Sequence, residues 1–337
     1  MMRPAAASRA AEILSIEPAT LARFADALRA VWPEVDAEFA PRLGVAVSGG
    51  PDSTALLLLA AAAFPGRIEA ATVDHGLRPA NAQEAEDVAQ LCGQIGVPHA
   101  TLPVSLEAGN IQDSARRARY AALGAWAQQQ QLGAIATAHH ADDQAETLIM
   151  RLNRASGVSG LAGVRARSRL PDAPLLLVRP LLAWRRAELG VVVAQAGVSA
   201  ADDPSNTDDR FDRARLRKAL AAAEWLDVAA VAQSAAHLTD ADAALSWSAD
   251  LEFGARVKRD PFGMTYRPMA PRAIALRVMA RILRELGEEA RGSAIARLFD
   301  GLVEGHPGSI GQLIVRPNAG GWSFAKAPAR RTAPKRG

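Results

Sequence analysis

Cysteine is almost absent from this chain, because Cys92 is the only one in 337 residues. A single cysteine excludes an internal disulfide framework, and it excludes any metal or persulfide site that needs two thiols from one chain. The chain also has no run of 18 apolar residues and no signal-peptide core at its start. We therefore predict a cytoplasmic protein that does not cross a membrane.

Lysine is scarce as well, since the first lysine is Lys218. No side chain before it can form a Schiff base, whereas arginine there offers fixed charge and bidentate contacts to phosphate. The arginine bias is equally explained by genome composition. The formal net charge is only +3, but residues 305–337 carry six basic side chains and no acid. A basic tail of this kind indicates contact with a polyanion.

The most informative stretch is residues 42–59, which read RLGVAVSGGPDSTALLLL. The apolar run predicts a buried strand, the glycines a tight turn and the leucines a helix. Glycine lets the backbone approach a ligand, and proline suits the first turn of a helix, where free N–H groups point outward. The turn therefore predicts an anion site made by Ser48, Gly49, Gly50, Pro51, Asp52 and Ser53.

This turn is not a Walker loop, because no lysine follows its glycines, and it is not G-x-G-x-x-G. It matches SGGxDS, the phosphate loop of the ATP pyrophosphatases. Ordinary turn chemistry is the alternative, because Gly-Gly-Pro-Asp is also a common turn sequence. The strand before the turn and the helix after it favour a site for ATP.

Short apolar segments alternate with helical patterns over the first 200 residues. We predict strands at 43–47, 67–73, 99–104, 132–138 and 175–182, with a loop at 165–174. This alternation predicts an α/β fold whose parallel sheet is covered on both faces. The expected divisions are a helical segment (1–40), the α/β catalytic domain (41–218), a helical domain that binds nucleic acid (219–300), and a short β unit with a basic tail (301–337).

Polar side chains follow two of the predicted strands. They are Asp74 and His75 after one strand, and His139, His140, Asp142 and Asp143 after another. Since the carboxyl ends of parallel strands face one crevice, we expect these side chains to meet the SGGPDS turn there. Asp52, Asp142 and Asp143 are candidate Mg²⁺ ligands. Two alternatives stay open. Asp142 caps a helix, or the histidines bind zinc, although no further pair of ligands has the spacing of a zinc site.

Arginines form two further groups. Arg116 and Arg119 lie three residues apart, so they share one face of a predicted helix. Arg213, Arg215 and Arg217 follow a polar turn at 203–206 and are partly neutralised by nearby acids. Either group taken alone is also typical of a solvated helix face.

Taken together, the motifs resemble the tRNA(Ile)-lysidine synthetase family. The matching segments occur in the family's order between residues 43 and 220: SGGPDS, VDHGLR, ARRARY, AHHADDQAET, RPLL, and DPSN followed by RARLR. Two positions depart from the family pattern, with Ala155 where glycine is usual and Ala214 where asparagine is common. Beyond residue 220 the resemblance is loose and the chain is short.

The resemblance implies an ATP- and Mg²⁺-dependent enzyme that joins free lysine to the wobble cytidine of an isoleucine tRNA with a CAU anticodon. An adenylated tRNA is the intermediate, AMP and pyrophosphate are released, and the tRNA then reads AUA instead of AUG. No protein partner is evident, and a homodimer is left open. The implied catalytic residues are Asp52, Asp142, Asp143 and Arg116, with Asp52 as the metal ligand.

The resemblance also implies binding roles. The implied ATP contacts are the SGGPDS residues with Asp74 and His75. The implied substrate and tRNA contacts are His139, His140, Glu146, Arg119, Arg213, Arg215 and Arg217.

Three rivals stay open at this point. A tRNA 2-thiolation enzyme would need more cysteines than this chain has, since one cysteine cannot ligate an iron–sulfur cluster. Small-molecule synthetases share SGGxDS but not the later motifs. A non-catalytic tRNA-binding protein would not need the full set of loop and carboxylate residues.

Overall fold

The computed structural model describes residues 4–37, 39–76, 79–104, 111–171, 173–201 and 212–327. The chain forms two compact units, residues 1–239 (unit 1) and 240–337 (unit 2). Parts of the predicted motifs lie outside the described residues, namely Leu77 and Arg78, the turn at 203–206 and the tail after residue 327.

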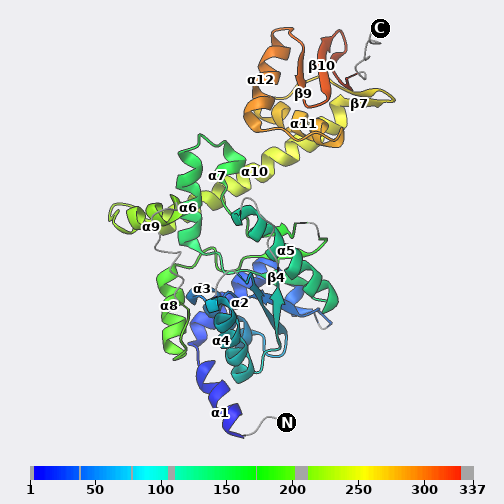
Figure 1. Ribbon diagram of the computed structural model, residues 1–337. Helices are drawn as coiled ribbons and strands as arrows, with labels where there is room; N and C mark the ends of the chain where they lie inside the picture. Colours follow the sequence, from blue (N-terminus) through cyan, green and yellow to red (C-terminus); the bar gives the residue numbers. More distant parts are fainter. Residues whose placement is uncertain are drawn as a thin grey trace, which may run out of the picture. The chain divides into compact units, whose positions relative to one another are not determined.

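Unit 1 is built on a six-stranded sheet whose order is β3-β2-β1-β4-β6-β5. Figure 1 shows this sheet, marked by β4, among the helices of unit 1. All neighbouring pairs are parallel except β6 with β5, which is antiparallel. This arrangement confirms the predicted α/β fold with a parallel sheet. In order across the sheet, the strands are β3 (His99–Pro103), β2 (Ile68–Asp74), β1 (Leu43–Ala46), β4 (Ala134–Ala136), β6 (Leu176–Val178) and β5 (Arg167–Arg169).

Helices cover both faces of this sheet. One face packs against α2, α3, α4 and α8, and the other against α5 with Tyr120, Leu123 and Trp126. Cys92 of α4 is buried in the first of these cores. The helices of unit 1 are α1 (Pro4–Ile13), α2 (Pro18–Val31), η1 (Pro33–Asp36), α3 (Pro51–Ala63), α4 (Pro79–Ile95), α5 (Ile111–Gln129), α6 (Ala141–Leu152), α7 (Val158–Leu161), α8 (Arg186–Gln195) and α9 (Asp212–Ala221).

The strand order places the crevice. The chain leaves β1 and builds β2 and β3 on one side, and it then returns to build β4 and β6 on the other. The connection that leaves β1 and the connection that leaves β4 therefore run to opposite sides of the sheet. In sheets of this kind, ligands bind between two such strands, outside their carboxyl ends. Residues 48–53 follow β1, and residues 139–143 follow β4. Both predicted motifs therefore lie together outside the carboxyl ends of β1 and β4.

Two local predictions differ from the structure of unit 1. Residues 167–169 form the edge strand β5 within the expected loop, because three residues pair with β6 across a gap in sequence that no local pattern reveals. Helix α6 begins at Ala141, with His140 at its N-cap, rather than at Asp142 or Asp143.

Unit 2 contains a five-stranded antiparallel sheet in the order β7-β8-β11-β10-β9. Its core includes Tyr266, Met279 and Phe324, between the sheet and three helices. The short β unit predicted within 301–337 is present at residues 308–326, but the stretch expected to be helical also contains the hairpin β7–β8, which pairs into the same sheet. The elements are α10 (Val228–Arg256, which crosses the unit boundary), β7 (Val257–Asp260), β8 (Gly263–Tyr266), α11 (Arg272–Glu285), α12 (Gly292–Val303), β9 (Gly308–Ile310), β10 (Leu313–Asn318) and β11 (Gly321–Lys326).

The hairpin escaped prediction because its strands have only four residues each, and the first strand has three consecutive charged residues, Lys258, Arg259 and Asp260, in place of an apolar alternation. Across the described ranges of the chain, no helix combines the length and apolar character needed to span a bilayer.

The leucines of α3 make a testable stability prediction. Leu57 is fully buried, so Leu57→Ala leaves a cavity and should lower the free energy of unfolding by about 2–5 kcal/mol. Urea titration of the full chain measures this change. Leu152→Ala is the control, because Leu152 is half-exposed and should change the value by less than about 0.5 kcal/mol. Equal effects at the two positions would contradict the packing described here.

Candidate active site

The SGGPDS loop is held in shape by its own serines. Gly49 has a φ of 87°, which favours glycine, and Gly50 is the N-cap of α3. The Ser53 hydroxyl donates to the Gly50 carbonyl at 3.0 Å and accepts the Ser48 N–H at 3.1 Å. The first N–H groups of α3 have no partner within the helix, so the loop presents them with the Ser48 hydroxyl as a ready anion site.

His140 lies between three carboxylates at the crevice. Its side chain is 2% exposed, with Nε2 3.4 Å from Asp52 and 3.5 Å from Asp143, and Nδ1 3.5 Å from Asp142. Burial alone would lower the pKa of His140, but the neighbouring carboxylates of Asp142, Asp52 and Asp143 raise that pKa to about 9. The imidazolium therefore links the start of α3 to the start of α6.

Asp142 is held by the start of α8. Arg185 donates to both of its carboxylate oxygens, at 3.2 and 3.3 Å, and the N–H of Arg186 donates at 2.8 Å. Burial would raise the pKa of Asp142, yet the bonds from His140, Arg186 and Arg185 hold that pKa well below its usual range. Asp142 is thus a charged link between α6 and α8.

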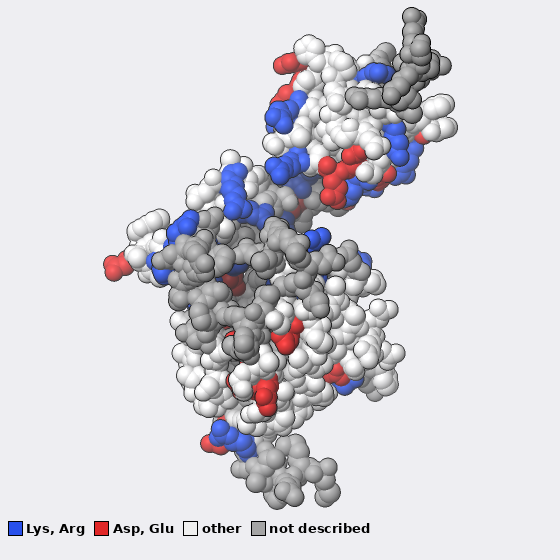
Figure 2. Space-filling view, viewed as in Figure 1, with Lys and Arg blue, Asp and Glu red and all other residues white. Residues whose placement is uncertain are grey.

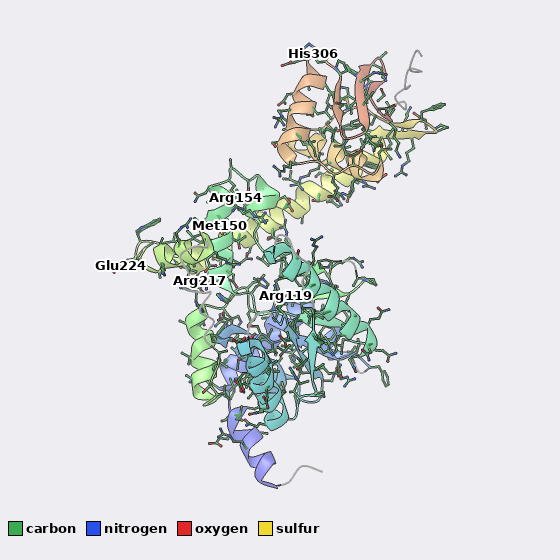
Figure 3. All side chains as sticks on the ribbon, viewed as in Figure 1. Arg119, Met150, Arg154, Arg217, Glu224 and His306 are labelled. Atoms are coloured by element: carbon green, nitrogen blue, oxygen red, sulfur yellow. The ribbon has the colours of Figure 1, made fainter. Side chains whose placement is uncertain are left out.

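Glu146 is a buried carboxylate paired with two arginines from α9. Arg213 Nε lies 2.6 Å and Arg217 Nε 2.7 Å from its two oxygens. Burial would raise the pKa of Glu146, but both guanidinium groups lower it. Arg213 also donates to Asp143 at 2.7 Å, so one guanidinium bridges two carboxylates of α6. Figure 3 shows Arg217 where α9 lies beside α6.

A second group of arginines borders the crevice from α5 and from the end of β6. The guanidinium carbons of Arg116 and Arg119 lie 5.2 and 5.6 Å from the centre of the Tyr120 ring. Neither arginine forms an ion pair with an acid of the described chain. Arg179, which follows β6, is buried and donates to the carbonyl of Arg165 at 2.7 Å. Positive charge without acidic partners favours a phosphate-bearing ligand.

The histidines beside these arginines are neutral. The pKa of His139 is lowered to about 4 by burial and by the charges of Arg179, Arg213 and Arg119, while Asp143 opposes this shift. Burial, followed by the charge of Arg119, also lowers the pKa of His75. The crevice therefore has two sides. Near α6 the carboxylates are paired with His140 and arginines, and near α5 the neutral histidines lie beside arginines without an acidic partner among the described residues.

Comparison with known proteins identifies the family. Residues 22–224 match the PP-loop domain family. The tRNA(Ile)-lysidine synthase of Novosphingobium aromaticivorans is 43% identical over 93% of this chain and 97% of its own length. That of Zymomonas mobilis is 41% identical over 87% of this chain and 90% of its own length. The chain belongs to the tRNA(Ile)-lysidine synthase family. It is therefore an ATP-binding PP-loop enzyme, and the predicted family is confirmed.

A solved structure supports the fold of this lysidine synthase family member. The U34-tRNA thiolase NcsA from Methanococcus maripaludis superposes with a TM-score of 0.53 over 66% of this chain and 78% of its own chain. At 13% sequence identity, the likeness shows a shared fold only.

The structure of this synthase brings most predicted site residues together. Asp52, His140, Asp142 and Asp143 form one cluster, and Glu146 joins it through Arg213. Asp74 closes a turn by accepting the N–H of Gly76, and Arg215 is exposed on α9. The sequence-based reasoning missed Tyr120, Arg179, Arg185 and Arg186. Arg179 directly follows β6, but the predicted strand ran on to residue 182, so the rule that found the other residues at strand ends did not select it.

The carboxylates of the crevice fit a Mg²⁺ ion only in combination with other ligands. Among the residues with described positions, no group of three His, Cys, Asp or Glu side chains could hold a metal alone. Asp52 nevertheless has a buried Oδ1 without a hydrogen-bond partner, 3.9 Å from Arg186 Nε. Mg²⁺ is commonly bound by one or two carboxylates together with substrate phosphates. Asp52 beside the phosphate loop fits this pattern.

Charge on the visible surface of this synthase is uneven. Figure 2 shows lysine and arginine side chains gathered around α6, α7 and α9 of unit 1 and over unit 2. Arg151 and Arg154 near the end of α6 are exposed. The basic side chains around α6 offer contacts to phosphate groups in unit 1.

The His140 cluster predicts a pH-dependent stability. Because the folded pKa of about 9 lies above the ordinary 6.5, the imidazolium stabilises the fold below pH 6.5, and this contribution is lost as the pH rises through 9. The rise of 2.5 pH units corresponds to a contribution on the order of 3 kcal/mol. Urea unfolding of the wild type and of His140→Gln, without nucleotide or Mg²⁺, measures the difference. A difference that stays constant from pH 6 to pH 10 would contradict this interpretation.

Proposed function

We propose that this enzyme joins the ε-amine of free lysine to C2 of the wobble cytidine in an isoleucine tRNA with a CAU anticodon. ATP activates the C2 oxygen in a first step that releases pyrophosphate, and lysine displaces AMP in a second step. The product tRNA reads AUA instead of AUG. The observation that carries the proposal is the meeting of the SGGPDS loop and the acid–arginine network of α6 and α9 at one crevice. The 41–43% identical relatives bear the matching name.

In the first step the loop and the arginines act on the phosphates. The N–H groups at the start of α3 and the Ser48 hydroxyl bind the pyrophosphate portion of ATP. Asp52 would hold Mg²⁺ there, and the ion supplies charge neutralisation for phosphoryl chemistry. Arg116 and Arg119 bind negative charge on the nucleotide or the tRNA. Asp74 and His75 lie at the neighbouring strand end, where the nucleoside part is expected.

In the second step the acids of α6 bind the lysine ammonium. Asp142 has both oxygens engaged by Arg185 and Arg186, which suits a positioning role. Asp143 and Glu146 instead share Arg213, whose side chain is 46% exposed. A cation thus already sits between these carboxylates, and an ammonium group has the same charge. Asp143, which is 14% exposed, is the candidate to accept the ammonium proton before attack.

The tRNA is bound by phosphate contacts from α9, the helical region after residue 218 and the basic tail, and its target base is turned out of the anticodon loop. His140 is too buried to contact a base, whereas half-buried His139 borders the opening. We propose a cytoplasmic location, and a homodimer is compatible with these roles.

The reaction is tested by incubating the enzyme with labelled lysine, ATP, Mg²⁺ and a CAU-anticodon isoleucine tRNA transcript. Label should enter the tRNA only with ATP, and a UAU anticodon should remove it. Asp52→Asn should reduce incorporation by about 100-fold or more, since a positioned charge of this kind contributes strongly to phosphoryl transfer. The control is Asp26→Asn, an exposed acid paired with Arg29 on α2, which should retain full activity. Cleavage of ATP without label in the tRNA would agree with an ATP-binding PP-loop fold but would contradict the proposed lysine and tRNA substrates.

The lysine-binding role of Asp143 has its own test. Asp143→Asn should raise the KM for lysine by about tenfold or more, because it removes a charge-assisted contact to the ammonium group. The KM for ATP should change little, and tRNA-dependent ATP–pyrophosphate exchange reports this first step separately. A loss of exchange with an unchanged KM for lysine would assign Asp143 to activation instead.

A further inference from the structure

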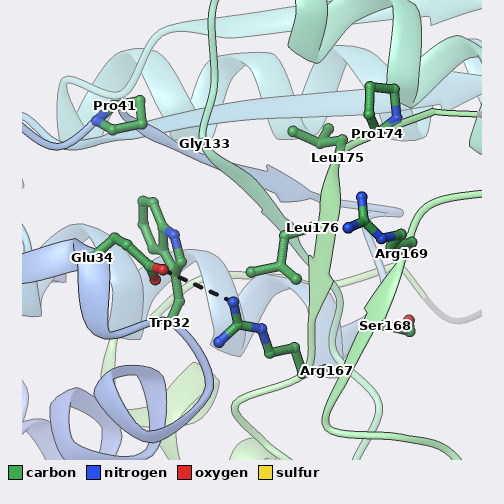
Figure 4. A pocket seen from close by; sticks show the side chains of 10 residues that line it. All are labelled: Trp32, Glu34, Pro41, Gly133, Arg167, Ser168, Arg169, Pro174, Leu175 and Leu176. Carbon is green, nitrogen blue, oxygen red and sulfur yellow. Dashed lines mark ion pairs between the residues drawn. The ribbon is translucent and has the colours of Figure 1, made fainter. Parts of the chain in front are cut away.

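A cavity lies in unit 1 at the end of the sheet where β4 and β6 begin, away from the crevice, and Figure 4 shows the side chains that line it. Its volume is about 490 Å³, within the range of small-molecule sites. Gly133, just before β4, and Leu176, the first residue of β6, line it where these strands begin. The crevice lies where β1 and β4 end, so the two cavities are at opposite ends of the same short strand.

The walls of this cavity come from two separate segments. Trp32 and Glu34 lie on one side, and Arg167 and Arg169 of β5 lie on the other. Arginines two residues apart on a strand share one side of it. Trp32 and Pro41 pack closely against the backbone at the start of β4 because residue 133 is glycine. A Cβ there would lie 2.8 Å from the Trp32 ring and 2.5 Å from Pro41. The shape of the cavity therefore depends on a glycine at position 133.

Hydrogen-bond donors predominate around the cavity. The side chain of Arg169 has no ion pair or hydrogen bond to any described residue, and the indole nitrogen of Trp32 faces the cavity without a described acceptor (Figure 4). Arg167 is paired with Glu34 only at 3.9 Å, and both side chains are half-exposed. An exposed pair at that distance contributes little, so Arg167 is available to a ligand that carries more negative charge.

We propose that this cavity binds a nucleotide through its phosphate. Two guanidinium groups and an indole N–H provide more donors than one carboxylate can accept, whereas a phosphate group has enough oxygens for them. The volume exceeds that of a phosphate alone, and the apolar side chains of Leu175, Leu176 and Pro174 suit a sugar and base. The ligand is either a free mononucleotide or one nucleotide of a bound RNA, and the second source rests on the proposed function.

The first experiment uses AMP as the probe. A non-hydrolysable ATP analogue with Mg²⁺ first fills the crevice, and calorimetry then measures AMP binding to the full-length enzyme. Arg169→Ala should weaken this binding about 10- to 100-fold, the effect of losing a charge-assisted bond. Glu34→Gln should strengthen it several-fold, because it removes the only carboxylate facing the arginines within the described lining. Arg9→Ala, which removes an exposed arginine of α1, should have no effect.

The second experiment separates the two sources. If the ligand is a nucleotide of RNA, AMP does not bind but Arg169→Ala lowers the salt dependence of tRNA binding by about one phosphate contact relative to Arg9→Ala. AMP binding that is insensitive to Arg169→Ala and Glu34→Gln would overturn the proposal. So would an absence of AMP binding together with an unchanged salt dependence. The AMP measurement needs neither lysine nor tRNA, so it stands even if the lysine-incorporation assay fails.

Discussion

The crevice depends on the pairing of buried charge between elements that are far apart in the sequence. His140 joins α6 to the phosphate loop through Asp52, Arg185 joins α8 to Asp142, and two arginines of α9 join Glu146. Removing one partner of a buried pair typically costs 3–5 kcal/mol, because the other charge is left uncompensated. Within unit 1, charge pairs at the site therefore link α3, α6, α8 and α9, in addition to the apolar core that α3 and α8 share.

This pairing also divides the crevice by charge. The acids lie near α6 and already bind cations, whereas Arg116, Arg119 and Arg179 lie near α5 and β6 with no acidic partner among the residues described. Neutral His139 and His75 lie beside these arginines. An arrangement with charges set in advance can bind an ammonium group at one end and phosphates at the other without large rearrangement.

Much of this organisation could be predicted from sequence, because it follows from local patterns and strand ends. The phosphate loop, the parallel sheet and the polar residues after β2 and β4 were found in this way. The partners of those residues were not. Arg185 and Arg186 reach the acids of α6 from more than 40 positions away, and β5 and the hairpin β7–β8 are too short to show a period. Burial of His140 was missed for the same reason, since neighbouring helices cover it only in the folded chain.

The lone cysteine has a practical consequence. Cys92 is fully buried, and burial raises the pKa of its thiol to about 12, so at neutral pH roughly one thiol in 100,000 is a thiolate. Reagents that attack thiolates should leave the native protein untouched. A cysteine introduced at an exposed position, such as Trp225 at the end of the turn after α9, would then be the single reactive site. The native chain is therefore a suitable background for fluorescent or spin labels that follow the approach of α9 to an RNA, without first removing any cysteine.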